Sequence, residues 1–461
     1  MTLLELDVNR WAEEQFGDCD LGDQRRTRRA VEVAAQFAAD PSGSTTRQTE
    51  TWGDCKAAYR LMDQKDITFR AMAEPHWRHT RAQTSGHFLL LGDTTTVSFG
   101  MARQIEGLGP VGDGGGRGFL LHSSLMVSAE GEEIVGMAGQ TIYHRKPAPQ
   151  GETYHQRLAR ERESKIWGEV IDLVGPAPQG VRFTHVFDRG ADNFEVYCRL
   201  VLNQAGWVVR VAQRKRRVVT PNGERCRLDH DLDSLPVSGT YELSVRANHD
   251  QPARTGTVEV RFGQLTVPRP KNCSKLVRRC GITAITMWVV EVREVNPPPG
   301  VEPLDWVLFT SHAVESFADA WRVIEYYEKR PLIEEYHKAL KTGCRLEVRQ
   351  YRKSRRLEAL CGMLSVLAVR LLQLKSVARV DPDRPAEHVV PKRWLHMARC
   401  TQRGRHRTIS TVQEFYHAVA RLGGWLGRKH DGQPGWITLW RGLDKLILMM
   451  RGADASASKC G

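Results

Sequence analysis

The order of hydrophobic and polar residues divides the chain into helical ends and a strand-rich middle. Apolar residues recur at helical spacing up to about residue 75 and again from about 314 to 451. Residues 87–147 contain apolar runs that predict strands, two of them around an AEGEE turn. A second strand-rich block spans 207–310 and is interrupted by the proline-rich segment 296–303. The pattern predicts an α/β or α+β chain in which a β-rich block is set into a mixed core.

The most apolar stretch, ALCGMLSVLAVRLLQL at 359–374, contains Arg370 and is too short to span a membrane comfortably. We therefore predict a buried core helix there. The N-terminal sequence MTLLELDVNRWAEEQFG has early acidic residues and no long apolar run, so it does not resemble a secretory signal. The ten cysteines form no C-x-x-C pair, which fits reduced thiols. These features predict a cytoplasmic protein with no membrane partner.

One helical segment, YYEKRPLIEEYHKALK at 326–341, carries four chemically distinct side chains at helical spacing. Successive steps of three, four and seven residues separate Tyr327, Arg330, Glu334 and Lys341. On a single helix these positions share one face, within an arc of about 60°. A phenol, a guanidinium, a carboxylate and an ammonium aligned in this way suit the recognition of phosphates beside metal ions.

Two features of this segment leave a purely structural explanation open. Glu334 and Lys338 are four residues apart, which is the spacing of an ordinary surface ion pair. Pro331 is typical of the first turn of a helix, so Tyr327 and Arg330 would lie just before the regular helix. From this segment alone, an ion-paired surface and a phosphate-binding face are equally consistent with the sequence.

Two aspartates stand in similar positions after apolar runs. Asp93 follows FLLLG and precedes three threonines, whereas Asp188 follows VRFTHVF and precedes RGAD. A carboxylate at the end of a buried strand lies at the rim of a sheet, where ligand sites form in mixed α/β folds. An aspartate there is more often a turn or cap residue. Together with Glu334, however, the pair could bind two Mg²⁺ ions roughly 3.5–4 Å apart, because hard cations prefer oxygen ligands.

The charge balance favours a polyanionic partner. The 461-residue chain has a formal net charge of +13, which is typical of proteins that meet nucleic acid or anionic membranes, although a solubilising surface gives the same charge. In LGDQRRTRRAVEVAAQFAAD (21–40), Asp23 is a candidate helix cap. Four arginines occupy the first turns that follow: Arg25, Arg26, Arg28 and Arg29. The helix dipole disfavours cations there, so a nearby phosphate backbone would compensate; a solvated basic face is equally consistent.

Taken together, these motifs resemble a known family over nearly the whole chain. The order Y-x2-R-x3-E-x6-K is similar to the signature of the insertion-sequence-four family of DDE transposases, which includes the Tn-five transposase. LLGDTTTVSF and HVFDRGAD resemble the segments that carry the two catalytic aspartates of that family. LGDQRRTRRAVEVAAQFA resembles its DNA-binding region, NPPPGVEPLDWVLFTSHAVES the strand before its catalytic helix, and VARLGGWL with ITLWRGLDKL its dimerisation region.

The resemblance implies a ribonuclease-H-like catalytic core with an inserted β-rich domain, placed between helical N- and C-terminal domains. We therefore expect a helical DNA-binding domain at 1–75 and a catalytic core at 76–370. The β-rich insertion would interrupt the core at about 207–305, and a helical dimerisation domain would occupy 371–461. The strand-rich block predicted from the residue pattern agrees with this arrangement.

The resemblance also implies a reaction and its participants. Asp93, Asp188 and Glu334 would hold Mg²⁺, with Mn²⁺ as a substitute, during 3′ nicking, hairpin formation, hairpin hydrolysis and strand transfer. Trp306 would hold a base flipped out of the hairpin. The other implied DNA contacts are Tyr327, Arg330, Lys341 and Arg210. The partners would be double-stranded DNA, as transposon-end inverted repeats and target DNA, and a second copy of the chain in the synaptic complex. The protein would lie in a bacterial cytoplasm and associate with the nucleoid when bound to DNA.

Two alternatives remain at this level. A DNA-binding inhibitor of transposition would need no catalysis, although three carboxylates facing a phosphodiester weigh against it. A metal-dependent endonuclease would cut DNA and stop without strand transfer. Pro331 also departs from the family, in which an aromatic residue at this position helps to grip DNA, so hairpin handling would differ in detail.

Overall fold

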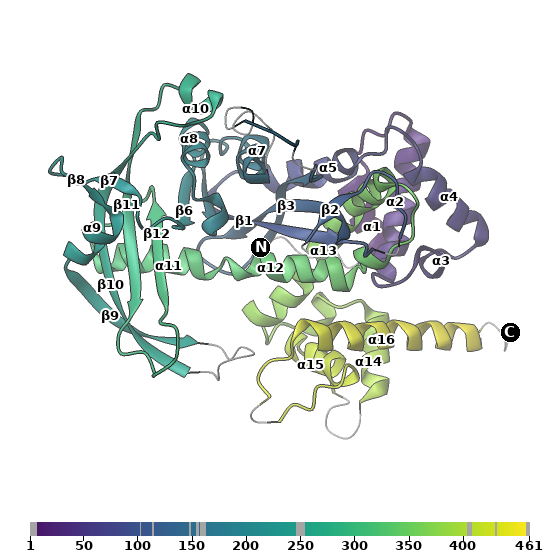
Figure 1. The fold of residues 1–461 in the computed structure, drawn as a ribbon. Coiled ribbons are helices and arrows are strands. Elements are labelled where there is room, and N and C mark those ends of the chain that lie inside the picture. Colours follow the sequence, from purple (N-terminus) through teal and green to yellow (C-terminus); the bar gives the residue numbers. More distant parts are fainter. Residues whose placement is uncertain are drawn as a thin grey trace.

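The computed structural model describes residues 7–457, except for 102, 113–114, 147–148, 154–155, 157–162, 246–253, 403–407 and 429–430. The chain combines a central mixed sheet with a helical N-terminal region and a helical C-terminal region (Figure 1). The β-rich part occupies one end of the molecule, and the N-terminal helices occupy the other. The mixed α/β class expected from the hydrophobic pattern is confirmed.

The N-terminal region is helical, and the predicted cap at Asp23 is present. The Asp23 side chain accepts a hydrogen bond from the backbone N–H of Arg25 at 2.8 Å. One face of each longer helix is buried against its neighbours and against the sheet. The helices are α1 (Val8–Phe16), α2 (Gln24–Ala39), α3 (Thr45–Gln48), α4 (Trp52–Met62) and α5 (Phe69–Arg81).

The first half of the sheet combines an antiparallel meander with parallel strands. Its neighbouring strands run in the order β2-β3-β1-β5-β6. Off this path, β4 also pairs with β3. β1 is antiparallel to β3 but parallel to β5, and β5 is parallel to β6. The strands are β1 (Gly86–Ser98), β2 (Gly109–Val111), β3 (Gly116–Ser128), β4 (Ile134–Tyr143), β5 (Val181–Phe187) and β6 (Gly206–Arg210).

The β-rich block continues the same sheet instead of forming a separate one. β12 pairs with β6, so a twelve-stranded sheet runs through the described residues. The limits of an inserted domain therefore stay a prediction. The remaining strands are β7 (Arg217–Val219), β8 (Arg225–Arg227), β9 (Val237–Val245), β10 (Arg254–Pro268), β11 (Ala284–Glu294) and β12 (Asp305–Thr310), with helices α9 (Leu228–Ser234) and α10 (Lys275–Arg279) beside them.

Helices cover the sheet and build the C-terminal region. α7 (Ile166–Val174) packs against β4 and α8 (Phe194–Leu202), while α12 packs against β1 and β3. Short turns of helix lie at Glu163–Lys165, Arg189–Ala191, Leu346–Val348 and Ala386–His388, and a π-helical turn lies at Ala339–Gly343. The other helices are α11 (Phe317–Glu328), α12 (Pro331–Lys338), α13 (Ser354–Val380), α14 (Lys392–Thr401), α15 (Val412–Leu422) and α16 (Trp436–Ala457).

The buried core helix predicted at 359–374 is confirmed as the middle of α13. Within the described residues, α13 is the one helix long and apolar enough to cross a membrane by length and composition, but 83% of its apolar window is buried inside the protein. Such burial is what a central core helix shows. Arg370 is itself buried, and its guanidinium carbon lies 5.2 Å from the centre of the Trp11 ring.

The two helical ends of the chain meet through a buried ion pair. Arg47 donates to both carboxylate oxygens of the fully buried Asp40, at 2.8 Å each, and to Asp444 of α16 at 2.9 Å. Arg451, also on α16, lies 3.3 Å from Asp40. A buried carboxylate needs such partners, because an unpaired charge would cost several kcal/mol. These contacts fasten α16 to the N-terminal helices.

Gly92 leaves room for the ring of Phe187 on one face of the sheet. A Cβ atom at this position would lie deep inside van der Waals contact with the ring of Phe187, the last residue of β5. Since interiors are close-packed, that ring would have to move and would take the chain end of β5 with it. The glycine thus leaves the Phe187 ring in place directly before the two aspartates.

We predict that Gly92→Ala lowers the free energy of unfolding by about 1–3 kcal/mol, the usual cost of overpacking. Gly53→Ala is the matched control, because a Cβ there meets only the Thr51 hydroxyl at 3.4 Å on an exposed helix, where alanine is favoured. Chemical denaturation of both variants measures the difference. Equal stability of the two variants would contradict this account of Gly92.

Candidate functional site

The segment with the four aligned side chains is not one continuous helix. α11 ends before Arg330, which is the N-cap residue of α12, and Pro331 occupies the first turn of α12. Tyr327 therefore belongs to α11, and Lys341 lies in the π-helical turn after α12. The single helical face expected from the spacing is therefore wrong, because Pro331 has no N–H with which to continue α11. The prediction that Pro331 lies in the first turn of a helix is confirmed.

The two aspartates lie at matching positions on neighbouring parallel strands. The register of β1 and β5 pairs Leu91 with Val186, and each aspartate lies two residues further on. Asp188 directly follows β5 and accepts a hydrogen bond from the backbone N–H of Gly190 at 2.8 Å. Asp93 does not end its strand as expected, because β1 continues to Ser98 by pairing with β3. The rim at this point is formed by the end of β5.

Arg330 draws the three predicted carboxylates together. Its Nη2 atom lies 3.3 Å from Oδ1 of Asp93 and 3.4 Å from Oδ2 of Asp188, while Nη1 donates to Oε1 of Glu334 at 2.6 Å. The carboxylates come from β1, from the turn after β5 and from α12. The surface ion pair considered between Glu334 and Lys338 is thus replaced by a pair with Arg330, and three distant segments face one cation.

Burial governs the electrostatics of this cluster. The Asp93 side chain is 16% exposed, and desolvation raises its pKa to about 6 although the charge of Arg330 works in the opposite direction. Burial likewise opposes the charge on Arg330, but the pKa of Arg330 is raised because Asp93, Asp188 and Glu334 together outweigh it. The cluster is an electrostatically coupled unit at the edge of the sheet.

Three further predicted residues, Arg210, Trp306 and Tyr327, lie on the side of the site where Asp188 is found. Arg210 ends β6, which is parallel to β5, and donates from Nη2 to the backbone oxygen of Asp305 at 3.1 Å. The rings of Trp306 and Tyr327 meet edge to face, with centroids 5.6 Å apart. Burial raises the pKa of Tyr327, and the nearby Arg210 charge partly offsets this. The structure thus brings an aromatic pair and an arginine next to Asp188.

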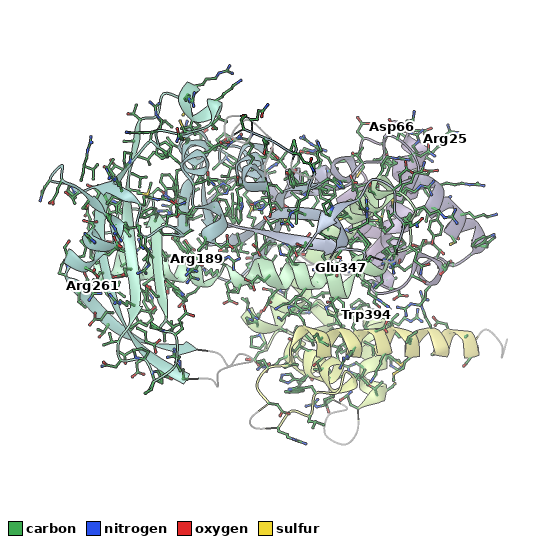
Figure 2. All side chains as sticks on the ribbon, viewed as in Figure 1. Arg25, Asp66, Arg189, Arg261, Glu347 and Trp394 are labelled. Atoms are coloured by element: carbon green, nitrogen blue, oxygen red, sulfur yellow. The ribbon has the colours of Figure 1, made fainter. Side chains whose placement is uncertain are left out.

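Lys341 marks the opposite end of the site. Its ammonium donates to the backbone oxygen of Thr96 at 2.8 Å and lies 3.2 Å from Glu347, which accepts a hydrogen bond from the backbone N–H of Ser98 at 2.9 Å. Figure 2 labels Glu347 and Arg189, the neighbour of Asp188; both lie near the middle of the molecule along α11 and α12. Lys341 therefore lies beside the part of β1 that continues past Asp93.

Sequence reasoning missed His337 and Glu347. His337 is buried on α12, and its Nδ1 atom lies 3.8 Å from Oδ2 of Asp93. Burial lowers the pKa of His337 to about 3, so the imidazole is neutral near pH 7. His337 follows Glu334 by three residues, and this helical spacing could have indicated it. No local pattern marked Glu347, which the tertiary fold brings to Lys341.

The donor set suits a hard divalent cation. Carboxylate oxygens are the ligands that Mg²⁺ prefers, and three carboxylates already converge on one positive charge. Within the described part of the chain, no group of three His, Cys, Asp or Glu side chains lies close enough to enclose a metal ion. Arg330 lies between the carboxylates, and its displacement would allow them to approach one cation.

The arginines at the start of α2 lie far from this cluster. Arg25 and its neighbourhood are at the outer end of the N-terminal helices (Figure 2). Arg25 pairs with Asp23 at 2.9 Å, Arg26 with Asp66 at 2.7 Å, and Arg29 with Asp54 at 3.4 Å. Internal partners thus offset part of the positive charge. Arg28 is exposed on the same helix.

Comparison with protein families gives two matches at the two ends of the chain. Residues 8–67 match the model described as transposase DNA-binding. Residues 366–461 match the transposase Tn5 dimerisation domain. The two matches support a Tn5-like transposase that binds DNA and dimerises. The DNA-binding match contains α1 to α4, and the dimerisation match contains the end of α13 and the helices after it.

We predict that the free energy of unfolding of Asp93→Asn increases relative to that of the wild type as pH rises. The folded pKa of about 6 lies above the ordinary value of 3.8, so the contribution of Asp93 to stability is complete below about pH 4 and is lost as pH rises through 6. Asparagine does not ionise. The difference in unfolding free energy between variant and wild type should therefore shift in favour of the variant by about 1 kcal/mol from pH 5 to pH 8.

Chemical denaturation in EDTA at the two pH values measures this shift. Asp172→Asn is the control, because Asp172 lies on the partly exposed surface of α7 and pairs with Arg199 instead of Arg330. A difference for Asp93→Asn that stays constant, or that moves in favour of the wild type at pH 8, would contradict the assignment.

Proposed function

We propose that this chain is a metal-dependent DDE transposase of the insertion-sequence-four type, which binds transposon-end inverted repeats as a dimer and moves DNA by a cut-and-paste reaction. The observation that carries the proposal is the convergence of Asp93, Asp188 and Glu334 on a single cation. Binding DNA alone requires no such arrangement, because phosphates are recognised by positive charge and carboxylates repel them.

The sheet supports a ribonuclease-H-like interpretation of the core. The meander β4-β3-β1 continues into the parallel strands β5 and β6, and the two aspartates emerge from the adjacent parallel pair β1 and β5. Glu334 reaches the same edge from a helix that follows the β-rich block. In this arrangement residues that are far apart in sequence are held on rigid elements, which is the requirement for aligning a phosphodiester.

Asp93, Asp188 and Glu334 would hold Mg²⁺ or, as a substitute, Mn²⁺. When bound, the ions supply an activated oxygen nucleophile and stabilise charge on the leaving oxygen. Arg330 and Lys341 would hold the phosphates of the DNA end, and Tyr327 would add a hydrogen bond. The half-buried ring of Trp306 stands beside the cluster, where it would stack on an unpaired base during hairpin formation. Arg210 would contact the DNA strand next to that base.

The decisive test first identifies inverted repeats of about twenty base pairs on the two sides of the gene. A duplex that carries this repeat is then incubated with Mg²⁺ and analysed on a denaturing gel. We expect the wild type to nick the repeat boundary and then form a slowly melting hairpin. With Glu334→Gln the amounts of nicked and hairpin product should fall by at least about 100-fold, because a carboxylate that would hold the metal ions is removed. Glu328→Gln, which changes the same charge on the exposed side of α11, should retain them.

The two alternatives give different results in the same experiment. An inhibitor of transposition would bind the duplex and leave it intact with Mg²⁺ and with Mn²⁺. A cut-only endonuclease would produce the nick but would fail to join a released 3′ end to target DNA. Retention of normal cleavage by Glu334→Gln would remove the proposed catalytic role of this carboxylate.

A separate prediction concerns the DNA-binding region. Arg28→Ala should weaken binding to the end duplex and reduce the magnitude of the slope of log K against log salt by about 0.9, because one phosphate contact is lost. Arg393→Ala, an exposed arginine of α14 that pairs with Asp454, is the charge-matched control. Fluorescence anisotropy at several salt concentrations measures both. An unchanged slope for Arg28→Ala would show that Arg28 belongs to a solvated face.

A further inference from the structure

We infer that Arg330 and the divalent metal ion compete for the same three carboxylates, and that DNA binding decides the competition. In the DNA-free protein the guanidinium serves as the counterion of the cluster and keeps metal affinity low. A phosphate of the DNA end withdraws the guanidinium and opens the carboxylates to metal. This inference rests on the proposed function, since it concerns the regulation of the same site.

The geometry makes simultaneous occupancy unfavourable. Nη2 of Arg330 lies 3.3 and 3.4 Å from the two aspartate oxygens, in the space between them. A Mg²⁺ ion would sit about 2.0–2.1 Å from the same oxygens. A guanidinium held where it is would then lie within a few ångströms of a doubly charged ion, and the repulsion in this partly buried site would be strong.

The charges explain why a counterion is needed before DNA arrives. Three carboxylates within reach of one another repel, and the Asp93 side chain is only 16% exposed, so little water screens its charge. Arg330 is 14% exposed and satisfies one oxygen of each carboxylate. A guanidinium is suited to this role because its planar fork presents several N–H donors in fixed directions, whereas an ammonium is a point charge.

The position of Arg330 also allows it to leave. It lies between α11 and α12, and its Nε atom has no hydrogen-bond partner among the described residues, so no bond anchors the stem of the side chain. Its contacts with the aspartates are longer than its contact with Glu334. A phosphate offers the same bidentate acceptor geometry as a carboxylate and can replace the two aspartates as its partner.

Direct measurement of Mn²⁺ binding tests the inference without relying on activity. The signal of unbound Mn²⁺ in electron paramagnetic resonance gives the affinity of the full-length protein, alone and with a duplex that ends at the repeat boundary, after subtraction of binding to the duplex. Without DNA, Arg330→Gln should bind Mn²⁺ at least tenfold more tightly than the wild type. With DNA, the affinity of the wild type should rise by at least tenfold and that of Arg330→Gln should change little.

Two variants show whether the effect depends on the fork or on charge in general. Arg330→Lys keeps the charge but cannot bridge three carboxylates, so its DNA-free affinity should fall between those of the wild type and Arg330→Gln. Arg322→Gln removes an exposed arginine of α11 that lies 3.6 Å from Asp319, and it should bind Mn²⁺ like the wild type. An equal gain in Arg322→Gln would show that net charge is responsible and would overturn the inference.

The double variant Arg330→Gln with Asp93→Asn separates the inference from the proposed function. If Asp93→Asn does not reduce Mn²⁺ binding in the Arg330→Gln background, the carboxylates are not the metal site, and both proposals fail. If it does reduce binding but the wild type and Arg330→Gln bind Mn²⁺ equally without DNA, only the competition is overturned. Thermal unfolding gives a second readout: Mn²⁺ should stabilise Arg330→Gln more than the wild type, and equal stabilisation would contradict the competition.

Discussion

The attraction between one guanidinium and three carboxylates organises the centre of this protein. Asp93, Asp188 and Glu334 repel one another, and Arg330 offsets this repulsion by pairing with all three at the edge of the sheet. In the folded chain this contact joins two strand segments to a helix from a much later part of the sequence. Arg210 at the end of β6, Trp306 on β12 and Tyr327 on α11 complete the surroundings of the cluster.

Backbone hydrogen bonding sets the geometry on which that attraction acts. The parallel register of β1 and β5 places the two aspartates side by side, and Gly92 leaves room for the ring of Phe187 on the face of the sheet. β1 then continues past the end of β5 on its pairing with β3, which leaves a step in the sheet at Asp93. A step of this kind gives a carboxylate partial burial together with an open side, which is the environment that raises its pKa and still admits a ligand.

The matched DNA-binding and dimerisation regions at the two helical ends of the chain are joined to this centre and to each other. α13 is buried along most of its length and touches the N-terminal helices, the sheet and the C-terminal helices. The ion-pair network of Asp40, Arg47 and Asp444 joins the two ends directly. The N-terminal helices, the sheet and the C-terminal helices are thus held together by packing on α13 and by the ion pairs between the two helical ends.

The sequence by itself determined the local features of this protein, because hydrophobic periodicity and capping are local properties. It indicated the helical ends, the strands around the AEGEE turn, the cap at Asp23 and the buried helix at 359–374, and it singled out the residues that the fold gathers. Only the tertiary structure decided how those residues meet. The continuation of β1 beyond Asp93, the burial of His337 beside Asp93 and the pairing of Lys341 with Glu347 depend on contacts between distant segments, which no local pattern encodes. Arg330 shows the difference most clearly: its spacing marked it as a phosphate contact, but its position among three carboxylates exists only once three separate parts of the chain have packed together.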